Sequence, residues 1–428
     1  MKRQKRYLAA VLAAMMLMLW GCAKDQPVIS DNSEGTEQSD TEIRSEEEAT
    51  ETETSSQEPV ETEPEVYVEP EVYVEPEVDL IMVGDILMHM RVTNSGKQAD
   101  GSYNYDHMFA PTKEMIESAD LAIVNQEVIL GGPELGYSGY PQFNAPYEVA
   151  DGLVNAGFDV VLHATNHTVD KGKQGVLNCL NYWETNFPQI GIIGMYGSQE
   201  ERDQVYVYEQ DGIRIAILNY TYGTNGLPVP EDMPFMVNLM SESLIRADIE
   251  KAREVADFVV VCPHWGTEYV HEPNKWQRNW GEFMIDCGAD LVLGTHPHVI
   301  QPVEWVETEA GNSGLIYWSI GNYINSTASS GAGVAERMLG AMATVTIAKT
   351  QEGEVYIKEY GAEPMITYVS ADGKEIVTYP MAEFTEDMAA ASSTQQKDPN
   401  FTLAYCKQVW EMVFGDMGTT EMSELSYN

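Results

Sequence analysis

Short runs of apolar, β-branched residues recur along the chain and predict buried strands, each followed by a polar loop. The clearest run covers residues 158–162, after which Thr165, Asn166 and His167 form a loop and a helix opens at Asp170 and Gly172. Comparable runs predict strands at residues 78–83, 121–124, 190–193, 205–208, 214–220, 258–262, 291–293, 303–307, 315–320, 342–348 and 354–360.

Helical patterns alternate with the earlier of these strands. We expect helices at residues 111–118, 147–156, 172–183, 241–256, 276–287 and 401–414. Gly157 and Gly288 each follow a helix as C-caps, and Asp211-Gly212 predicts a hairpin. Strands that alternate with helices and then follow one another in a run predict an α/β sandwich of two β-sheets flanked by helices.

The amino terminus has the pattern of a secretory signal. Basic residues precede an apolar run at residues 7–20 and the pair Gly21-Cys22. Residues 19–22 resemble a bacterial lipobox, which predicts a lipoprotein signal peptide over 1–22 and a lipid on Cys22. A simple membrane anchor is the alternative. Either interpretation places the folded part outside the cytoplasm.

Residues 23–78 have the composition of a disordered acidic tether. They hold 19 Asp and Glu, against Lys24 and Arg44 alone, and a PEVYVE repeat closes them. A segment with so few large apolar residues cannot bury a core, and regularly spaced proline favours an extended spacer. We therefore expect the globular domain at residues 79–370, followed by a C-terminal extension, 371–428, with a terminal helix.

The charge and the cysteines exclude other classes of protein. The formal net charge is −44, and no basic stripe is present, so we expect no nucleic-acid partner. Apart from Cys22, the chain has Cys179, Cys262, Cys287 and Cys406, without CxxC spacing, which predicts buried thiols rather than a disulfide framework.

Polar side chains of one chemical kind follow five of the predicted strands. Taken singly, each has a simpler explanation: Asp85 could cap a turn, Asn166-His167 could be a helix-capping turn, and His264 could be a core histidine. Together they are a good ligand set for one or two divalent ions, because strand ends can face one crevice. The set is Asp85, Asn125 with Glu127, Asn166 with His167, His264, and His296 with His298.

The order and spacing of these motifs resemble the calcineurin-like metallophosphoesterases and, more closely, the CapA/PgsA family of capsule and poly-γ-glutamate synthesis. The resemblance covers about residues 79–350 and implies the metallophosphoesterase sandwich as the fold. Its motifs are VGDILM (83–88), NQE (125–127), FNAP (143–146), GFDVVLHATNHTVDKG (157–172), HWGTEY (264–269), GTHPHVIQPVE (294–304) and SIGNYI (319–324).

The resemblance also implies roles for individual residues. It makes His167 the candidate acid, with Asp170 as the second candidate catalytic residue. Two departures from the wider superfamily leave open whether one or two ions bind: Leu87 stands where an imidazole ligand is usual, and the second motif supplies Glu127 in place of an aspartate. The candidate ligands for Mn, Zn or Fe are Asp85, Glu127, Asn166, His264, His296 and His298.

The resulting hypothesis is a lipid-anchored protein on the extracellular face of the cytoplasmic membrane, acting in capsule or poly-γ-glutamate synthesis. It would be a metal-dependent hydrolase or transferase for a phosphoester or a γ-glutamyl substrate. The alternative is a non-catalytic surface scaffold that binds or passes on a growing anionic polymer, and a plain cell-wall binding module is a third possibility. Expected partners are the anionic polymer or its precursor, the membrane through Cys22, and other capsule-synthesis membrane proteins.

Overall fold

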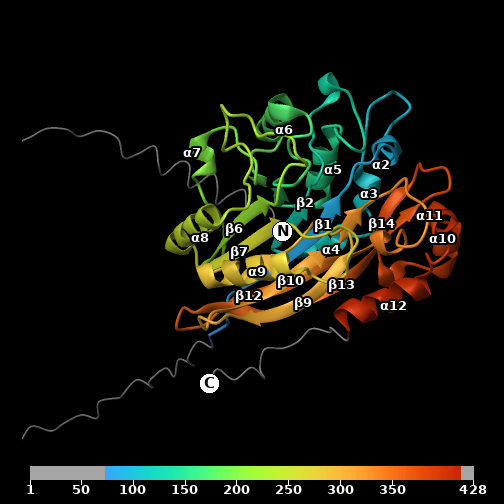
Figure 1. Ribbon diagram of the computed structural model, residues 1–428. Helices are drawn as coiled ribbons and strands as arrows, with labels where there is room; N and C mark the ends of the chain where they lie inside the picture. The colour runs from blue at the N-terminus through green and yellow to red at the C-terminus, as the bar shows by residue number, and fades with distance from the viewer. Residues whose placement is uncertain (1–72, 416–428) are drawn as a thin grey trace, which may run out of the picture. The chain divides into compact units, whose positions relative to one another are not determined.

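The computed structural model describes residues 73–415 and shows two β-sheets with helices around them (Figure 1). The predicted signal peptide, Cys22 and most of the tether lie outside the described residues. Within residues 73–415, no helix combines the length and the apolar character needed to cross a membrane.

The first sheet has eight strands, and the strand that begins the domain lies in its interior. β1 pairs in parallel with β2 on one side and antiparallel with β12 on the other. A short strand, β11, pairs in parallel with the end of β1. In spatial order the strands are β14 (Ile376–Pro380), β13 (Val355–Val369), β12 (Leu339–Lys349), β1 (Glu77–Ile86), β2 (Leu121–Asn125), β3 (Val160–Leu162) and β4 (Gly191–Ile193), with β11 (Asn322–Ile324) beside β1.

The second sheet has six strands, four of them parallel. Asp211 and Gly212 both have positive φ, 52° and 78°, and join β5 to β6, which confirms the predicted hairpin. Both edge strands, β5 and β9, run antiparallel to their neighbours. The spatial order is β5 (Tyr206–Gln210), β6 (Ile213–Thr221), β7 (Phe258–His264), β8 (Leu291–Leu293), β10 (Ser313–Ile320) and β9 (Ile300–Glu307).

The two sheets pack face to face around a common apolar core. Met82, Ile347 and Tyr317 belong to this core, and the first two come from one sheet and the third from the other. The Tyr317 hydroxyl donates to the carbonyl of Gly361 at 2.7 Å, so a polar contact also ties the sheets together. A second core, which includes Ile249 and Trp265, lies between the six-stranded sheet and the helices α8 (Glu242–Val255) and α9 (Lys275–Cys287).

The helices begin and end where local sequence dictates. Ser241 caps α8 through a hydrogen bond from the Leu244 N–H, and Gly157 and Gly288 end their helices in the left-handed conformation, as predicted. The α-helices are α2 (Met90–Ser95), α3 (Asp106–Phe109), α4 (Lys113–Ser118), α5 (Glu148–Ala156), α6 (Gly172–Asn186), α7 (Gln199–Arg202), α8 (Glu242–Val255), α9 (Lys275–Cys287), α10 (Glu386–Ala391), α11 (Ser393–Lys397) and α12 (Leu403–Phe414). Short 3₁₀ turns are η1 (Pro133–Leu135), η2 (Glu336–Met338) and η3 (Met381–Glu383).

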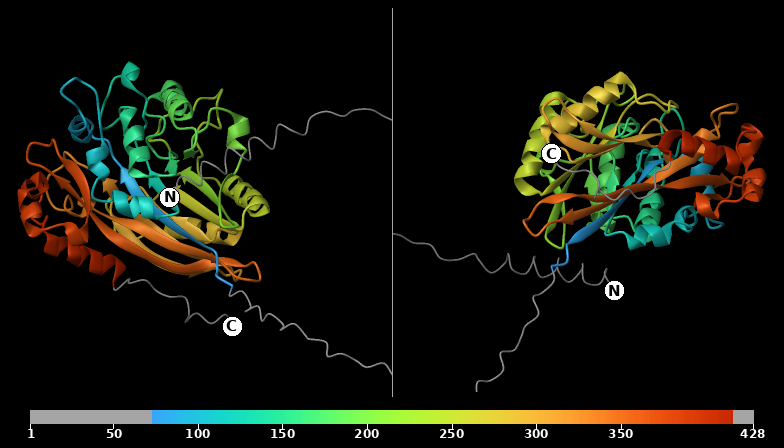
Figure 2. Two further views of the ribbon diagram at one scale, coloured as in Figure 1. Left: turned by 180° about the vertical axis from the view of Figure 1, so that it is seen from behind. Right: turned by 90° about the horizontal axis from the view of Figure 1, so that it is seen from below.

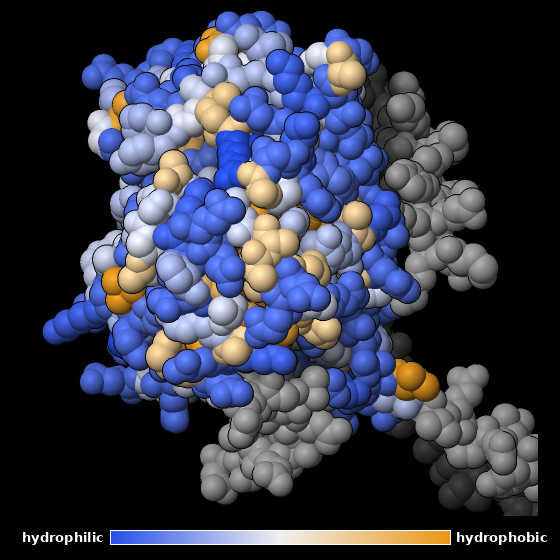
Figure 3. Space-filling view, turned by 90° about the vertical axis from the view of Figure 1, so that its right-hand side faces the viewer, coloured by the Kyte–Doolittle hydropathy of each residue, from blue (hydrophilic) through white to orange (hydrophobic). Residues whose placement is uncertain are grey.

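The sheet continues beyond residue 370, because β14 pairs with β13. The last helices, α10 to α12, lie at that end of the sheets, and α12 contacts β9 (Figure 2). The four cysteines of the described chain are free, and Cys179, Cys262 and Cys406 are buried, which confirms their prediction as thiols. The face drawn in Figure 3 is largely hydrophilic, with apolar residues scattered over it.

Candidate metal centre

All six predicted metal ligands lie in one buried cluster at the carboxyl ends of parallel strands from both sheets. Asp85 is near the end of β1, and it pairs in register with Asn125 of β2 and Asn322 of β11. His264 ends β7, and a parallel bridge joins it to Thr295 after β8. The geometry therefore places these residues together for the reason expected, because parallel strand ends meet at one edge of a sheet.

Asp85 is fully buried and tightly held. Its Oδ1 accepts a hydrogen bond from the Asn125 amide at 2.8 Å, and its Oδ2 lies 3.0 Å from Nδ1 of His298. Asn125 is thus a partner of the carboxylate, and it orients Asp85 within the cluster.

Glu127 is the most unusual group in the cluster. It is fully buried, and neither carboxylate oxygen has a hydrogen-bond partner among the described residues. The nearest nitrogens, Nε2 of His264 and Nδ1 of His298, both lie 3.8 Å away. Burial raises the pKa of Glu127 well above its usual range, the neighbouring His298 opposes that rise, and Asp85 adds to it. A buried carboxylate with free lone pairs is costly unless a cation accompanies it.

The histidines differ in their electrostatics. Burial and neighbouring imidazoles hold the pKa of His264 and of His296 well below the usual value, so both rings are neutral at pH 7. For His298, burial alone would lower the pKa, but the carboxylates of Glu127 and Asp85 outweigh it and raise the pKa to about 9. Neutral imidazole is the form that ligates metals.

The hydrogen bonds of the rings leave nitrogen atoms directed into the cluster. His264 uses Nδ1 with the Thr295 hydroxyl at 2.9 Å, and its Nε2 lies 3.0 Å from Oδ1 of Asn166. The buried Nδ1 of His296 has no hydrogen-bond partner among residues 73–415. His296 and His298 both have positive φ, 96° and 58°, so the turn after β8 is bent to bring both rings inward.

The donor set fits a divalent cation. Three overlapping groups have ligand atoms within 4.8 Å of one another, and Glu127 belongs to two of them. Imidazole nitrogens and carboxylate oxygens without thiolate suit Mn, Zn or Fe, and the unpartnered atoms of Glu127 and His296 are those that an ion would satisfy. The three groups are Glu127 with His264 and His296, Glu268 with His296 and His298, and Asp85 with Glu127 and His298.

Two residues of this region were not predicted from the sequence. Glu268 lies in the HWGTEY motif and joins a ligand group despite its exposure, and its spacing of four from His264 was the available signal. His89 follows β1 with its ring 5.1 Å from that of Phe143, and its half-buried surroundings lower its pKa to about 4, chiefly through burial. Leu87, which stands at the usual position of an imidazole ligand, is itself buried.

His167 and Asp170 form a dyad next to Asn166. Nδ1 of His167 lies 2.6 Å from Oδ2 of Asp170, which also accepts the backbone N–H of Phe143 at 2.7 Å. The Phe143 ring meets the imidazole edge-on at 4.7 Å between centroids. These contacts fix the orientation of the ring and direct Nε2 away from Asp170.

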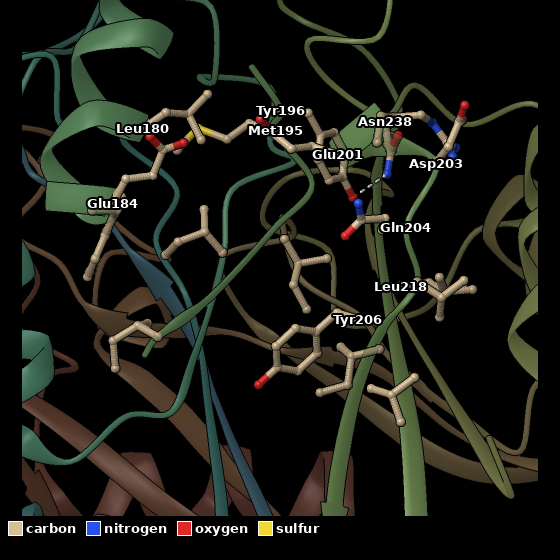
Figure 4. Close-up of a pocket in the computed structure, with 18 of the residues that line it drawn as sticks. Leu180, Glu184, Met195, Tyr196, Glu201, Asp203, Gln204, Tyr206, Leu218 and Asn238 are labelled. Carbon is tan, nitrogen blue, oxygen red and sulfur yellow. Dashed lines mark hydrogen bonds between the residues drawn. The ribbon is translucent and has the colours of Figure 1, made fainter. Parts of the chain in front are cut away.

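A separate cavity of about 450 Å³ lies beside β4 and β5, and none of the predicted site residues lines it. Its wall combines apolar side chains such as Leu180 and Met195 with Tyr196 and Asn238, which are hydrogen-bonded to each other at 3.3 Å (Figure 4). The cluster described above is therefore distinct from this cavity.

Comparisons with known proteins agree with the resemblance seen in the motifs. The sequence profile of the family described as "Bacterial capsule synthesis protein PGA_cap" matches residues 79–327. The chain is 28% identical over 250 residues to "PGA biosynthesis protein CapA" of Bacillus subtilis, covering 56% of this chain and 62% of that protein. It is 27% identical over 254 residues to "Capsule biosynthesis protein CapA" of Bacillus anthracis, covering 57% and 59%. The chain thus spans about three-fifths of the length of these curated relatives.

Among solved structures, the chain is similar to the NAD nucleotidase of Haemophilus influenzae, with a TM-score of 0.42 and 10% identity over 79% of this chain and 60% of that one. It is also similar to a 5'-nucleotidase precursor of Thermus thermophilus, with a TM-score of 0.42 and 13% identity over 78% and 59%.

Proposed function

Because the chain belongs to the family of bacterial capsule synthesis proteins, we propose that it is a metal-dependent hydrolase or transferase of capsule or poly-γ-glutamate synthesis. The observation that carries this proposal is Glu127, a buried carboxylate with two unpartnered oxygens among three histidines. A buried site with these donor atoms suits a cation, and it lies at the carboxyl ends of the parallel strands, where the polar residues meet.

The bound ion would polarise an oxygen of the substrate and activate water. Asp85, Glu127, Asn166, His264, His296 and His298 are the residues that would hold it, with Glu268 as a further ligand at the exposed side.

His167 is the proposed general acid. Asp170 accepts a hydrogen bond from Nδ1 of His167, so that Nε2 is the atom that would donate a proton to the leaving oxygen or nitrogen. Phe143 keeps the ring in place through its edge-on contact and its hydrogen bond to Asp170.

The proposed substrate class is a phosphoester or a γ-glutamyl bond of a polymer or its precursor. The names of the Bacillus relatives refer to PGA and to capsule biosynthesis, which supports a polymer for this chain as well. We further propose that lipidated Cys22 anchors the domain at the extracellular face of the cytoplasmic membrane, with residues 23–78 as a spacer, where it would meet other capsule-synthesis membrane proteins.

The second candidate function is a scaffold that binds and passes on the anionic polymer without cleaving it. Leu87 favours it, because a buried leucine stands at the position of one usual imidazole ligand. A scaffold still requires the cluster to be stable, but it does not require a proton donor.

The first experiment tests the metal site through two of its histidines. In the purified full chain, His296→Ala with His298→Ala should abolish bound Mn²⁺, Zn²⁺ or Fe measured by elemental analysis. His107→Ala, a histidine on α3 outside the cluster, is the matched control. If the double variant keeps its metal and its melting temperature, the metal site is wrong.

His167→Ala should keep the metal and the fold but lower turnover of a panel of phosphoesters and γ-glutamyl peptides by roughly 10²–10⁴. A scaffold predicts the opposite in cells. Normal capsule or poly-γ-glutamate yield from His167→Ala with normal metal content would refute the catalytic function and support the scaffold.

A further inference from the structure

Arg337 lies at the edge of the metal cluster. It is on the 3₁₀ turn η2, and its Cζ is 3.6 Å from the centre of the Tyr269 ring. The Tyr269 ring is in turn 5.9 Å from the ring of His298, between centroids. Two successive ring contacts therefore connect the guanidinium to a predicted metal ligand.

Apart from the Tyr269 ring, the guanidinium of Arg337 has no ion-pair partner within residues 73–415. Its Nε is buried and makes no hydrogen bond, and no carboxylate of the described chain lies within ion-pair distance. An unpaired, half-buried cation is unexpected in a chain with 68 acidic and only 24 basic residues. Arg91 donates to the backbone carbonyls of Ser370 and Ala371, and the exposed Arg246 stacks on Phe283. The other four arginines of the described chain form ion pairs: Arg202 with Asp248, Arg214 with Asp257, Arg253 with Asp290, and Arg278 with Glu304.

The surroundings of Arg337 are fixed rather than open to rearrangement. Glu336 uses one carboxylate oxygen with Tyr405 of α12 at 2.6 Å and the other with His271 at 3.3 Å. Asn322 donates to the carbonyl of Arg337 at 2.9 Å, while its own Oδ1 lies 3.1 Å from Nδ1 of His298. The same amide thus holds both the metal cluster and the arginine.

The one exposed acidic residue of the ligand groups does not neutralise this cation. Glu268, next to Tyr269 in sequence, places a carboxylate oxygen in the ligand group with His296 and His298 instead of forming an ion pair with Arg337. The rim of the cluster is aromatic: Tyr269 is 44% exposed, and Tyr222, 40% exposed, lies 4.7 Å from His296. A free guanidinium on an aromatic face beside a cation site is suited to hold an anion.

We propose that Arg337, supported by Tyr269, is an anion-binding subsite of the metal centre, and that it holds an oxyanion of the substrate next to the bond that reacts. This inference rests on the proposed function and adds the substrate class to it. Phosphate and carboxylate share the geometry that a guanidinium recognises through two parallel hydrogen bonds. The subsite would orient the anion and act on substrate affinity, so Arg337 is a specificity residue.

The test measures binding of two probes, inorganic phosphate and a short γ-glutamate oligomer, to the purified full chain by calorimetry, with and without Mn²⁺. Arg337→Gln should weaken binding of at least one probe by about 10- to 100-fold, the usual effect of losing a hydrogen bond to a charged group. Arg337→Lys keeps the charge but loses the planar guanidinium, so its affinity for the probes should lie between those of the wild type and Arg337→Gln. An effect on phosphate alone assigns a phosphoryl group, and an effect on the oligomer alone assigns a carboxylate.

Arg278→Gln is the matched control, because Arg278 also stacks on an aromatic ring, 5.2 Å from Trp318, but lies outside the cluster. It should bind both probes as the wild type does. Metal content and melting temperature of Arg337→Gln should equal those of the wild type. The subsite is refuted if Arg337→Gln binds both probes normally, or if the wild type binds neither. Metal retained by the variant with His296→Ala and His298→Ala would refute the proposed function instead, and the metal-free titration would still report on Arg337.

Discussion

Glu127→Gln should stabilise the metal-free protein against unfolding. The variant should also lose the rise in melting temperature that the wild type shows when metal binds. The substitution preserves the shape of a fully buried side chain whose two oxygens have no hydrogen-bond partner among the described residues. It removes the charge, which is the part that burial penalises. It also removes the carboxylate shared by two of the three possible ligand groups, so an ion would lose its central oxygen ligand.

The magnitude follows from linkage. A cation at about 100 times its dissociation constant stabilises the native state by about 2.7 kcal/mol. With an unfolding entropy of about 2.1 cal/mol/K per residue over residues 73–415, about 1 kcal/mol shifts the melting temperature by roughly 1.4 °C, so the wild type should gain about 4 °C with Mn²⁺. Glu127→Gln should gain none. Without metal at pH 8 the variant should melt at or above the wild-type temperature, because burial penalises the ionised form of Glu127 and glutamine has no ionised form.

The stability of the metal-free wild type should change with pH in a definite direction. The folded-state pKa of Glu127 is raised above the usual 4.5, so above 4.5 the native state holds a proton that the unfolded state has released. The free energy of unfolding of the metal-free wild type therefore falls as pH rises from about 4.5 towards the folded pKa, and the variant lacks this contribution. The difference between the two proteins should widen in favour of the variant across that range.

The assay is thermal unfolding of the full chain at pH 5 to 8, once with a chelator and once with Mn²⁺. Glu114→Gln, which removes an exposed carboxylate on α4, is the control and should respond to metal as the wild type does. Equal gains with Mn²⁺ in Glu127→Gln and wild type would refute the reasoning. So would a metal-free variant that melts well below the wild type at pH 8.

Three further predictions concern other residues. Asp170→Asn should keep the metal but lower turnover by roughly 10²-fold or more, because the carboxylate 2.6 Å from Nδ1 of His167 becomes a neutral amide; an unchanged kcat at normal metal content would count against the dyad. In the metal-free protein His298 should titrate at about 9 by NMR. The stability that its proton contributes is then complete below the usual pKa of 6.5 and is lost as pH rises through about 9. A titration midpoint at or below 6.5 would contradict the pairing of His298 with carboxylates. Cys22→Ala should abolish labelling by a fatty-acid probe and release the protein or leave it unprocessed, and persistent labelling would exclude the lipid anchor.

The features predicted from sequence are those governed by local pattern. Apolar runs identified β7 and β8, the pair Asp211-Gly212 identified its hairpin, and Gly157 and Gly288 ended their helices as expected. The cluster could be predicted for a related reason. When polar residues follow parallel strands, the topology brings them to one edge whatever the loops do, so Asp85 and His264 approach within 3.9 Å although they are far apart in sequence.

The features that were missed depend on tertiary contacts. β11 is a three-residue strand that exists because Asn322 pairs with Asp85 of β1, and β14 is short and has no strand beyond it in the sheet. Glu268 meets His296 and His298, and Arg337 meets the Tyr269 ring, through contacts between segments that are distant in the sequence. No periodic pattern in the sequence reports such contacts.

The interior position of β1 has a consequence for how the protein is made. A chain that leaves the cell amino terminus first would deliver β1 early, yet β12, which covers its second edge, is encoded near the end of the domain. Until β12 emerges, an apolar strand edge has no partner, and such edges promote aggregation of nascent chains. His298 also emerges late, so Oδ2 of Asp85 has no imidazole partner until then. If the domain is exported as proposed, its centre would take up an ion only after translocation is nearly complete. The metal supply of the outer compartment, and not that of the cytoplasm, would then decide which ion it binds.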